Sequence, residues 1–424
     1  MSEVHYDWAI GESYPFIQQH SIAKHEILHA YLTAYIQTLI SNPNREEFRL
    51  ALVDGFAGGG AYRHSLTGET MPGSPFIMLQ AAQEAEVLVN ANRHKPVSLD
   101  LDYFFIEEKR ASALHLEHEL KQRGYGNRLG NDIFLRNASF ADQADGIVEY
   151  VKKRSPRAGR AIFLLDQYGY SQVPVSLISK IIRQLPGSEV ILTFAVDAML
   201  NYVTDLNGAT QTMLNNIGIP DVFRGRTIDD IKSKETDWRL FIQSCLYKEL
   251  VDNCGAKYYT LFFIRSDKGH GDYWLIHFSQ KARARDVMTR IHWLKNTNFI
   301  HYGGAGLEMF SALGYIPRND ADFTGQGSLF CFDDDAKQKS VSTLMEQIPH
   351  LIYPDPDGMT FGEMFATTCN MSPASADVYR HSLGHLIELG EIEVVGQDGS
   401  HRRSPNRIHD SDQIIAPKQR RLFY

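Results

Sequence analysis

Apolar residues recur along the chain in two different patterns. Between residues 25 and 40 they return every three or four positions, which predicts a helix with one apolar face and Ser21 as its N-cap. Elsewhere they form short continuous runs that predict buried strands. These strand runs cover residues 50–53, 103–106, 133–135, 161–165 and 190–194. Another helix is expected from Val175, directly after Pro174.

Strands that alternate with helices predict an α/β fold, with a parallel sheet covered by helices on both faces. Near its end the pattern changes, because the strand-like runs KYYTLFFIRS and DYWLIHFS are separated only by the glycine-containing turn DKGHG. A terminal antiparallel hairpin on a parallel sheet is typical of Rossmann-like class I methyltransferase folds. A dehydrogenase sheet usually ends parallel. Residues 197–250 are polar and helical, and we expect them to form an insert over the carboxyl ends of the strands, where ligands bind.

A second, smaller domain is expected after the polar linker YPDPDG, residues 353–358. Thr360 begins the T-x-x-E spacing of a capping box, which predicts a helix start. The next helix is expected from Ser372 to about Leu389, with Gly390 as the residue that ends it. The strand EIEVV, a GQDG turn and a basic tail follow, and together these elements predict a winged helix-turn-helix.

Length and composition agree with two soluble domains. A chain of 424 residues is too long for one small core, and its 43% apolar and 22% charged residues are ordinary for a globular protein. The expected parts are a methyltransferase-like domain over 1–305, a connecting segment over 306–353 and a winged-helix domain over 354–424. No apolar run is long enough to span a membrane, and the first residues lack a secretion signal. Four scattered cysteines without a C-x-x-C pair predict a reducing cytoplasm and no metal–sulfur site.

The stretch LALVDGFAGGGAYRHS ends a buried strand with Asp54 and a cluster of glycines. Glycine lets a loop turn sharply and approach a ligand closely. A dinucleotide fingerprint that starts at Gly58 needs glycine where Arg63 stands, and no Gly-Lys-Ser/Thr follows as a P-loop requires. The spacing D-x-F-x-G-x-G, with Phe56 as its aromatic residue and Gly60 as its last, instead fits a loop that binds S-adenosylmethionine.

Two further positions extend this cofactor hypothesis. Glu107 closes the next strand in YFFIEEK, where a carboxylate accepts hydrogen bonds from both ribose hydroxyls. Ser139, in RNASFAD after the third strand, is expected near the adenine. The alternative is a glycine-rich turn that binds no ligand.

The fourth strand ends in IFLLDQYGYS, which places Asp166 at its carboxyl end, before Gln167, Tyr168 and Tyr170. In methyltransferases that act on exocyclic amino groups, this position holds [D/N]-P-P-[Y/F/W]. The side-chain oxygen accepts the amino protons and orients the nitrogen lone pair, so that positioning does most of the catalytic work. Asp166 is the expected acceptor, and Tyr168 or Tyr170 the ring that stacks on the base. The alternative is an aspartate that caps the following helix.

The chain resembles the three-Cys-motif partner family (TcmP). The resemblance rests on HSIAKHEILHAYL, DGFAGGGAY, PGSPFIML, FFIEEK, FLLDQYGYSQVPVSLI and the strand pair near FFIRSDKGHGDYWLIHF, over about residues 15–300. It implies a Rossmann-like methyltransferase domain and an association with a radical-SAM-type protein that carries a three-cysteine motif. The family's usual D-P-F-G reads D-Q-Y-G here.

The order of K-H, D-x-x-A-G-x-G-x-Y and D-x-Y is also similar to ribosomal-RNA adenine-N6 methyltransferases. By that resemblance Lys24 and His25 contact the carboxylate end of the cofactor. The alternative is that both side chains face solvent from an exposed side of their helix. Pairs of histidines with metal-ligand spacing also occur, but no third ligand stands near them in sequence, so we expect no metal site.

The basic tail offers a nucleic-acid interface within an acidic protein, since the chain's formal net charge is −8. Arg402, Arg403 and Arg407 are the expected phosphate contacts. Winged helices also dock proteins, and this alternative remains open. The sequence therefore predicts an S-adenosylmethionine-dependent methyltransferase that acts on an amino group in nucleic acid. The alternative function is a catalytically degenerate adaptor that binds DNA or a partner protein.

Overall fold

The computed structural model describes residues 6–167, 171–204, 208–235, 238–264, 273–295, 300–302, 304–307, 309 and 329–417. Contacts divide the chain into two compact units. The N-terminal unit comprises Met1–Trp238 and Cys245–Ala284, and the C-terminal unit comprises Arg239–Ser244 and Arg285–Tyr424. The domain ends expected at residues 305 and 353 stay predictions.

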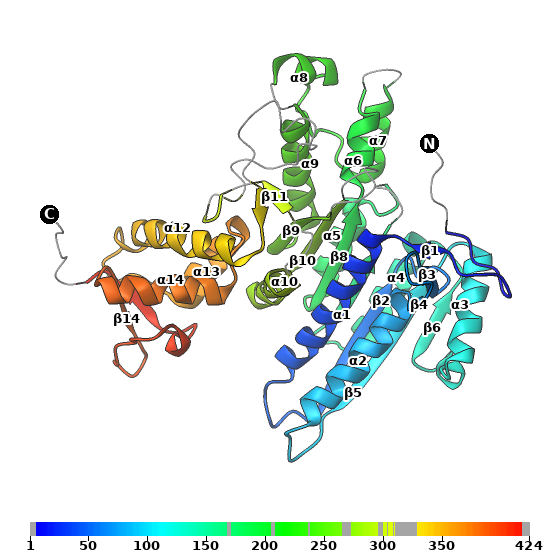
Figure 1. Cartoon of the computed structure of the whole chain (residues 1–424), viewed down its shortest axis with the longest axis horizontal. Coiled ribbons are helices and arrows are strands. Elements are labelled where there is room, and N and C mark those ends of the chain that lie inside the picture. The colour runs from blue at the N-terminus through cyan, green and yellow to red at the C-terminus, as the bar shows by residue number, and fades with distance from the viewer. Residues whose placement is uncertain are drawn as a thin grey trace. The chain divides into compact units, whose positions relative to one another are not determined.

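The N-terminal unit is built on a seven-stranded sheet with the order β6-β5-β2-β7-β8-β10-β9 (Figure 1). The strands are β2 (Glu47–Asp54), β5 (Ser98–Ile106), β6 (Ile133–Arg136), β7 (Ala161–Leu165), β8 (Ser188–Phe194), β9 (Tyr258–Ile264) and β10 (Tyr273–Ser279). Strand β10 is antiparallel to both of its neighbours, and the other pairs are parallel. This is the Rossmann-type methyltransferase sheet predicted from the sequence, closed by the expected hairpin.

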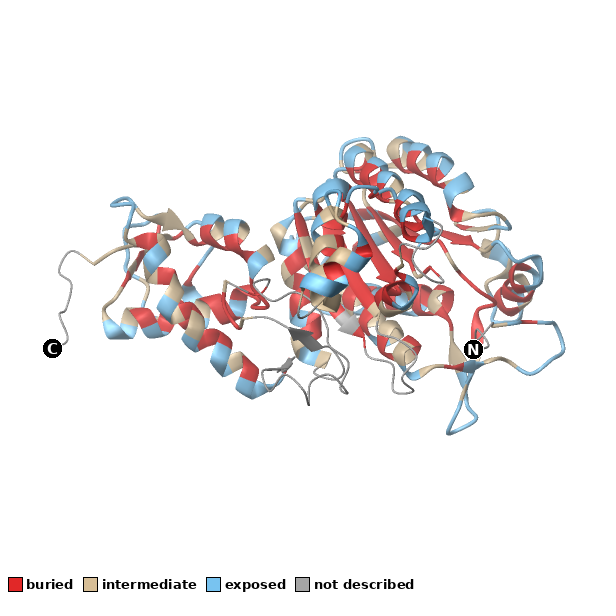
Figure 2. Cartoon of the chain, turned by 90° about the horizontal axis from the view of Figure 1, so that it is seen from above, coloured by how far each residue is buried: buried red, intermediate tan, exposed pale blue. Residues whose placement is uncertain are grey.

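Helices follow the strands in the predicted alternation. They are α1 (Gln19–Leu39), α2 (Ser74–Asn90), α3 (Arg110–Gln122), α4 (Phe140–Arg154), α5 (Val175–Gln184), α6 (Val196–Tyr202), α7 (Ala209–Ile217), α8 (Ile228–Lys234) and α9 (Trp238–Cys254). Helices α1 and α2 pack together in front of β2 and β5 in Figure 1. A small sheet of β1 (Phe16–Ile17), β3 (Ala61–His64) and β4 (Thr70–Pro72) lies in the same unit. Figure 2 shows burial concentrated in the strands of the large sheet.

The expected N-cap at Ser21 is wrong, because α1 begins two residues earlier. The Ser21 N–H already donates to the carbonyl oxygen of Gln18 at 3.0 Å, so the chain is helical there. Pro174, in contrast, directly precedes α5 as expected.

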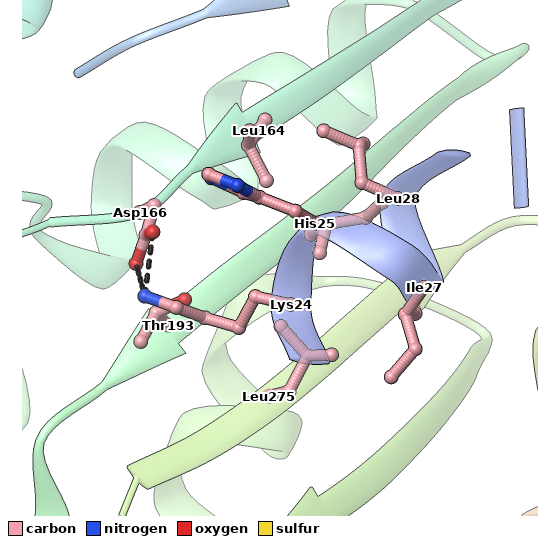
Figure 3. A pocket seen from close by; sticks show the side chains of 9 residues that line it. Lys24, His25, Ile27, Leu28, Leu164, Asp166, Thr193 and Leu275 are labelled. Atoms are coloured by element: carbon pink, nitrogen blue, oxygen red, sulfur yellow. Dashed lines mark hydrogen bonds and ion pairs between the residues drawn. The ribbon is translucent and has the colours of Figure 1, made fainter. Parts of the chain in front are cut away.

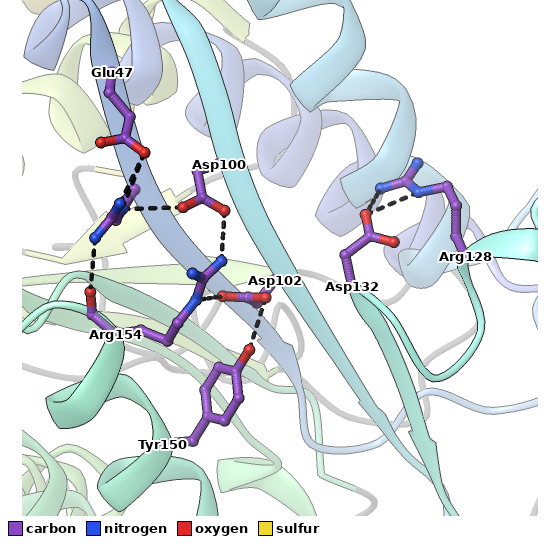
Figure 4. Close-up of polar contacts among 8 residues, drawn as sticks. Glu47, Asp100, Asp102, Arg128, Asp132, Tyr150 and Arg154 are labelled. Atoms are coloured by element: carbon purple, nitrogen blue, oxygen red, sulfur yellow. Dashed lines mark hydrogen bonds and ion pairs between the residues drawn. The ribbon is translucent and has the colours of Figure 1, made fainter.

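A network of charged side chains holds the first halves of β2 and β5 to α4 (Figure 4). Arg154 donates to Asp100 at 2.6 Å and to Asp102 at 3.2 Å, and Tyr150 donates to Asp102 at 2.9 Å. Arg49 joins from β2 and pairs with Asp100 at 3.0 Å. The network lies away from the ends of the parallel strands at Asp54 and Ile106, so it fixes the strands without occupying the edge where ligands bind.

The C-terminal unit contains the predicted winged helix-turn-helix. Its elements are α12 (Asp334–Ile352), β13 (Met359–Thr360), α13 (Phe361–Thr368), α14 (Ala376–Leu389), β14 (Glu393–Val395) and β15 (Gln413–Ile415). The last three strands form a sheet in the order β13-β15-β14, and a separate ladder joins β11 (Ile300–Tyr302) to β12 (Leu329–Cys331). Thr360 and Glu363 exchange both hydrogen bonds of the expected capping box. Helix α12, which lies in the expected connecting segment, packs on α14.

Helix α14 begins at Ala376 rather than at the expected Ser372, because helix α10 (Ala282–Lys295) holds the intervening turn. The buried Arg285 donates to the carbonyl oxygens of Ser372 and Ala374, the latter at 2.9 Å. Asp286 accepts a hydrogen bond from the Ala376 N–H at 2.7 Å and thereby caps α14. A cap contributed from a distant helix leaves no local signal in the sequence.

Candidate functional site

The predicted functional carboxylates meet at one edge of the large sheet. Strands β5, β2, β7 and β8 are adjacent and parallel, so their carboxyl ends lie on the same side. Asp54 ends β2, while Glu107 and Asp166 directly follow β5 and β7. The order of the strands reverses at β2, and ligands of open α/β sheets bind at such a switch point.

Asp54 is fully buried and only partly satisfied. Its Oδ1 accepts a hydrogen bond from the Phe56 N–H at 3.1 Å, and its Oδ2 has no hydrogen-bond partner among the described residues. Burial raises the pKa of Asp54 to about 7, although the nearby Ser74 side chain offsets part of the rise. Buried polar atoms are nearly always paired in native proteins. An unpaired carboxylate oxygen at this edge therefore fits a site for a cationic group of a ligand.

Asp54 gives the ligand-free protein a testable pH dependence. Its folded pKa of about 7 lies above the unfolded value, so between these values only the folded state holds the proton, and stability falls as pH rises. We expect Asp54→Asn to remove this decrease, which is about 2 kcal/mol between pH 5 and pH 7.5. Urea unfolding of both proteins at the two pH values measures it. Parallel stability curves for variant and wild type would contradict the assignment.

The side chain of Glu107, which is expected to bind the cofactor ribose, is fixed by two backbone N–H groups, one of them in the glycine loop. Its Oε2 accepts a hydrogen bond from the Gly58 N–H at 2.9 Å, and its Oε1 accepts one from the Lys109 N–H at 2.8 Å. Gly58 and Gly60 have φ values of +61° and +86°, a left-handed conformation that favours glycine. These contacts hold the loop and the carboxylate in one arrangement before any ligand binds.

Trp8 packs on the same glycine loop. Its Nε1 donates to the Ala61 carbonyl oxygen at 2.6 Å, and its ring lies 5.3 Å from the Tyr62 ring. A Cβ atom at Gly59 would overlap the Trp8 ring. Gly59 is therefore required by packing, whereas Gly58 and Gly60 are required by backbone conformation. No motif marks Trp8, because it contacts the loop from far away in sequence.

Lys24 and Asp166 form an ion pair at the carboxyl end of β7 (Figure 3). The Lys24 Nζ donates to both carboxylate oxygens of Asp166 at 2.6 Å. Burial alone would raise the pKa of Asp166, but the charge and hydrogen bonds of Lys24 outweigh burial and lower it. The cavity beside the pair is small, with a volume of about 10 Å³. Leu164 and Thr193 are among the residues that line it.

Two histidines of α1 lie near this pair. Burial, followed by the charge of Lys24, lowers the pKa of His20 and of His25 to about 4. Both imidazoles are consequently neutral near pH 7. His20 stacks on Tyr273 at 4.9 Å, and the Lys24 Nζ lies 5.8 Å from the centre of that same ring. The similarity to ribosomal-RNA adenine-N6 methyltransferases implied a cofactor contact for His25. No pattern in the sequence pointed to His20 or Tyr273.

Gln167 stands where the related motif has proline, and its side chain makes three hydrogen bonds. Its side-chain oxygen accepts hydrogen bonds from the N–H groups of Gln172 and Val173, at 2.9 and 3.0 Å. Its amide nitrogen donates to the Thr193 carbonyl oxygen at 3.2 Å. Gln167 is thus joined by its side chain to Gln172, Val173 and Thr193. The expected stacking residues Tyr168 and Tyr170 lie outside the described residues.

Ser139 has a structural role that explains its position. It is the N-cap of α4, where its Oγ accepts a hydrogen bond from the Asp142 N–H at 3.2 Å and donates to the Asp142 carboxylate at 2.7 Å. Its contact with a cofactor adenine stays a prediction, as do the cofactor roles of Phe56, Lys24 and His25.

The three expected phosphate contacts of the C-terminal unit differ in their surroundings. Arg402 donates to both oxygens of the buried Asp412, at 2.9 and 3.1 Å, so its charge is already paired. Arg403 and Arg407 are exposed. The exposed positions of α14 carry Asp377, His381, His385, Glu388 and Leu389. Of the four arginines in residues 354–417, Arg403 and Arg407 are the two that are exposed, and their contact with phosphates stays a prediction.

Neither a metal cluster nor a membrane span is present in the part of the chain that the structure describes. No group of three or more His, Cys, Asp or Glu side chains there could hold a metal ion. No described helix is both long and apolar enough to cross a bilayer.

Comparisons with known proteins identify the C-terminal domain type. A family model described as a GMT-like wHTH domain matches residues 314–399. No curated protein matches the chain. Among solved structures, protein LPL1258 from Legionella pneumophila, of family model DUF519, is 9% identical, covers 60% of this chain and 85% of that one, and gives a TM-score of 0.31.

Two other solved structures are a complex of Trm1 with S-adenosyl-L-methionine and a geranyl diphosphate methyltransferase. Trm1 from Pyrococcus horikoshii with S-adenosyl-L-methionine is 10% identical, covers 81% of this chain and 78% of that one, and has a TM-score of 0.29. Geranyl diphosphate methyltransferase with sinefungin is 11% identical, with 66% and 90% covered and a TM-score of 0.25. Because these scores are low, the fold assignment of the large sheet rests on its strand order. The resemblance to the TcmP family stays a prediction.

Proposed function

We propose that this chain is an S-adenosylmethionine-dependent methyltransferase that acts on an exocyclic amino group in nucleic acid. The observation that carries the proposal is the unpaired, buried Oδ2 of Asp54 beside a glycine loop that is hydrogen-bonded to Glu107. When bound, the cofactor supplies an electrophilic methyl group.

Each residue of the site has a distinct part in this proposal. Asp54 receives the cofactor's ammonium group, Glu107 accepts from its ribose hydroxyls, and Gly58 lets the backbone approach it. Lys24 binds its carboxylate. Asp166 accepts the amino protons of the acceptor and aims the nitrogen lone pair, a task of positioning that needs no strong base. An acceptor base within a duplex must leave the stack to reach the ends of the strands.

Calorimetric titration with S-adenosylmethionine tests the cofactor first. We expect the wild type to bind, Asp54→Ala to lose binding, and Asp145→Ala, which removes a mostly exposed carboxylate from the same unit, to bind as the wild type does. Absence of binding by the folded wild type, also in the presence of a three-Cys-motif partner protein, would contradict the proposal. With binding established, transfer of labelled methyl groups to ribosomal RNA, transfer RNA and DNA identifies the acceptor.

A second candidate is an adaptor that has the methyltransferase fold but docks a partner protein, with the suspected three-Cys-motif radical-SAM-type protein as the first to test. The acidic side chains on α14 favour it, because they repel phosphate and suit a basic protein surface. Loss of nucleic-acid binding in Arg403→Ala/Arg407→Ala would favour the methyltransferase that acts on nucleic acid. Unchanged partner binding without methyl transfer to any nucleic acid would favour the adaptor.

A further inference from the structure

Lys24 and Asp166 are assigned to different ligands in the proposed function, yet the structure shows them bound to each other. The two side chains come from α1 and from the end of β7, and Lys24 Nζ reaches both oxygens of Asp166 at 2.6 Å. Their side chains are 12% and 27% exposed, so the pair is largely shielded from water. A shielded ammonium and carboxylate are costly to separate unless another partner replaces the one that leaves.

Two imidazoles and an aromatic ring lie near Lys24 among the described residues. His20 and His25 are neutral near pH 7, and the Lys24 Nζ lies 5.8 Å from the centre of the Tyr273 ring. On the Asp166 side, the neighbouring Gln167 is itself fixed, because its side-chain oxygen accepts from the N–H groups of Gln172 and Val173. Lys24 is therefore the mobile partner, because a lysine side chain has four rotatable bonds and Asp166 is anchored at a strand end.

We propose that Lys24 is an interlock between the two substrates: the cofactor's carboxylate draws the ammonium away from Asp166, and only then can Asp166 accept the amino protons of the acceptor. This inference rests on the proposed function. It makes Lys24 a positioning residue for the acceptor as well as a contact for the cofactor. Binding is consequently ordered, with the cofactor first, because the acceptor's hydrogen-bond partner is engaged until the cofactor arrives.

The interlock predicts that removing the charge of Asp166 strengthens cofactor binding, which a purely structural ion pair would not do. In Asp166→Asn the ammonium of Lys24 no longer has to leave a carboxylate. S-Adenosylhomocysteine is the suitable probe because its neutral thioether lacks the sulfonium charge that Asp166 itself would attract. Methylthioadenosine is the matched control ligand, since it lacks the amino-acid end that Lys24 would bind.

The experiment is calorimetric titration of both thioethers into the full-length wild type and its variants. We expect Asp166→Asn to bind S-adenosylhomocysteine about fivefold more tightly than the wild type and methylthioadenosine equally well. The gain should vanish in Lys24→Met/Asp166→Asn, which completes a double-mutant cycle. Asp145→Asn serves as the control for loss of a carboxylate elsewhere. If Asp166→Asn does not melt cooperatively, Asp166→Ser takes its place with the same expectation.

The outcomes separate the interlock from the proposed function. Unchanged or weaker binding of S-adenosylhomocysteine to the folded Asp166 variant, with normal binding by the wild type, overturns the interlock alone. An equal gain for both thioethers also overturns it, because the effect would then not depend on the cofactor's carboxylate. If the folded wild type binds neither thioether, the proposed function fails and the interlock fails with it.

Discussion

Asp166→Ala is expected to bind the cofactor but to transfer the methyl group about a thousandfold more slowly than the wild type. A preorganised hydrogen-bond partner of the reacting group accounts for a rate effect of this size. Asp166 lies at the carboxyl end of β7, next to the strand that carries Asp54, and in the ligand-free protein its ion pair with Lys24 lowers its pKa. The measurement is transfer of labelled methyl groups to the acceptor found by screening, under single-turnover conditions with saturating cofactor.

The matched control for this loss is a residue of the other compact unit. Arg403→Ala removes an exposed charge from the C-terminal unit and should change the affinity for nucleic acid rather than the rate of the bound complex. Calorimetry on Asp166→Ala confirms that the cofactor site is intact. Transfer by Asp166→Ala within tenfold of the wild-type rate would show that another group orients the acceptor.

The second large effect concerns stability. Tyr31 on α1, Glu189 on β8 and His277 on β10 form a fully buried cluster, in which Glu189 accepts a hydrogen bond from Tyr31 and lies 2.9 Å from the His277 Nε2. Removal of one partner from a buried charged cluster leaves the others unsatisfied. We therefore expect Glu189→Ala to lower the free energy of unfolding by about 3 kcal/mol, as measured by urea unfolding.

Glu84→Ala is the matched control for Glu189→Ala. Glu84 also contacts a histidine, His29 at 3.2 Å, but half of its side chain is exposed. Exposed pairs contribute at most about 1 kcal/mol. Similar losses in both variants would mean that the buried cluster is not a distinct source of stability in the N-terminal unit.

The large sheet and the winged helix were predictable because each of their elements has a local pattern. The apolar runs at 50–53, 161–165 and 190–194 fall inside β2, β7 and β8, and the hairpin signal correctly placed the antiparallel β10. The start of α14 was predicted wrongly because distant contacts decide the local structure there. Helix α14 begins at Ala376 because Arg285 and Asp286, both on α10, hold the chain that precedes it.

The candidate site was predictable in its residues but not in their pairing. Strand ends marked Asp54, Glu107 and Asp166, since parallel strands bring their carboxyl ends to one edge. The ion pair of Lys24 with Asp166 joins residues 142 positions apart, and periodicity carries no information about such contacts. The same is true of Arg402, which appears as a free cation in the sequence but is bound to Asp412 in the structure.

The contact of Trp8 with the glycine loop has a consequence for evolution. Gly59 is confined to glycine by the indole ring, while Gly58 and Gly60 are confined by their positive φ values. Homologues with a small residue at the position of Trp8 should therefore admit alanine at the position of Gly59 and keep the other two glycines. Covariation between positions 8 and 59 would then show that packing against the indole ring conserves Gly59. A glycine at position 59 whatever residue stands at position 8 would instead show that ligand binding conserves it.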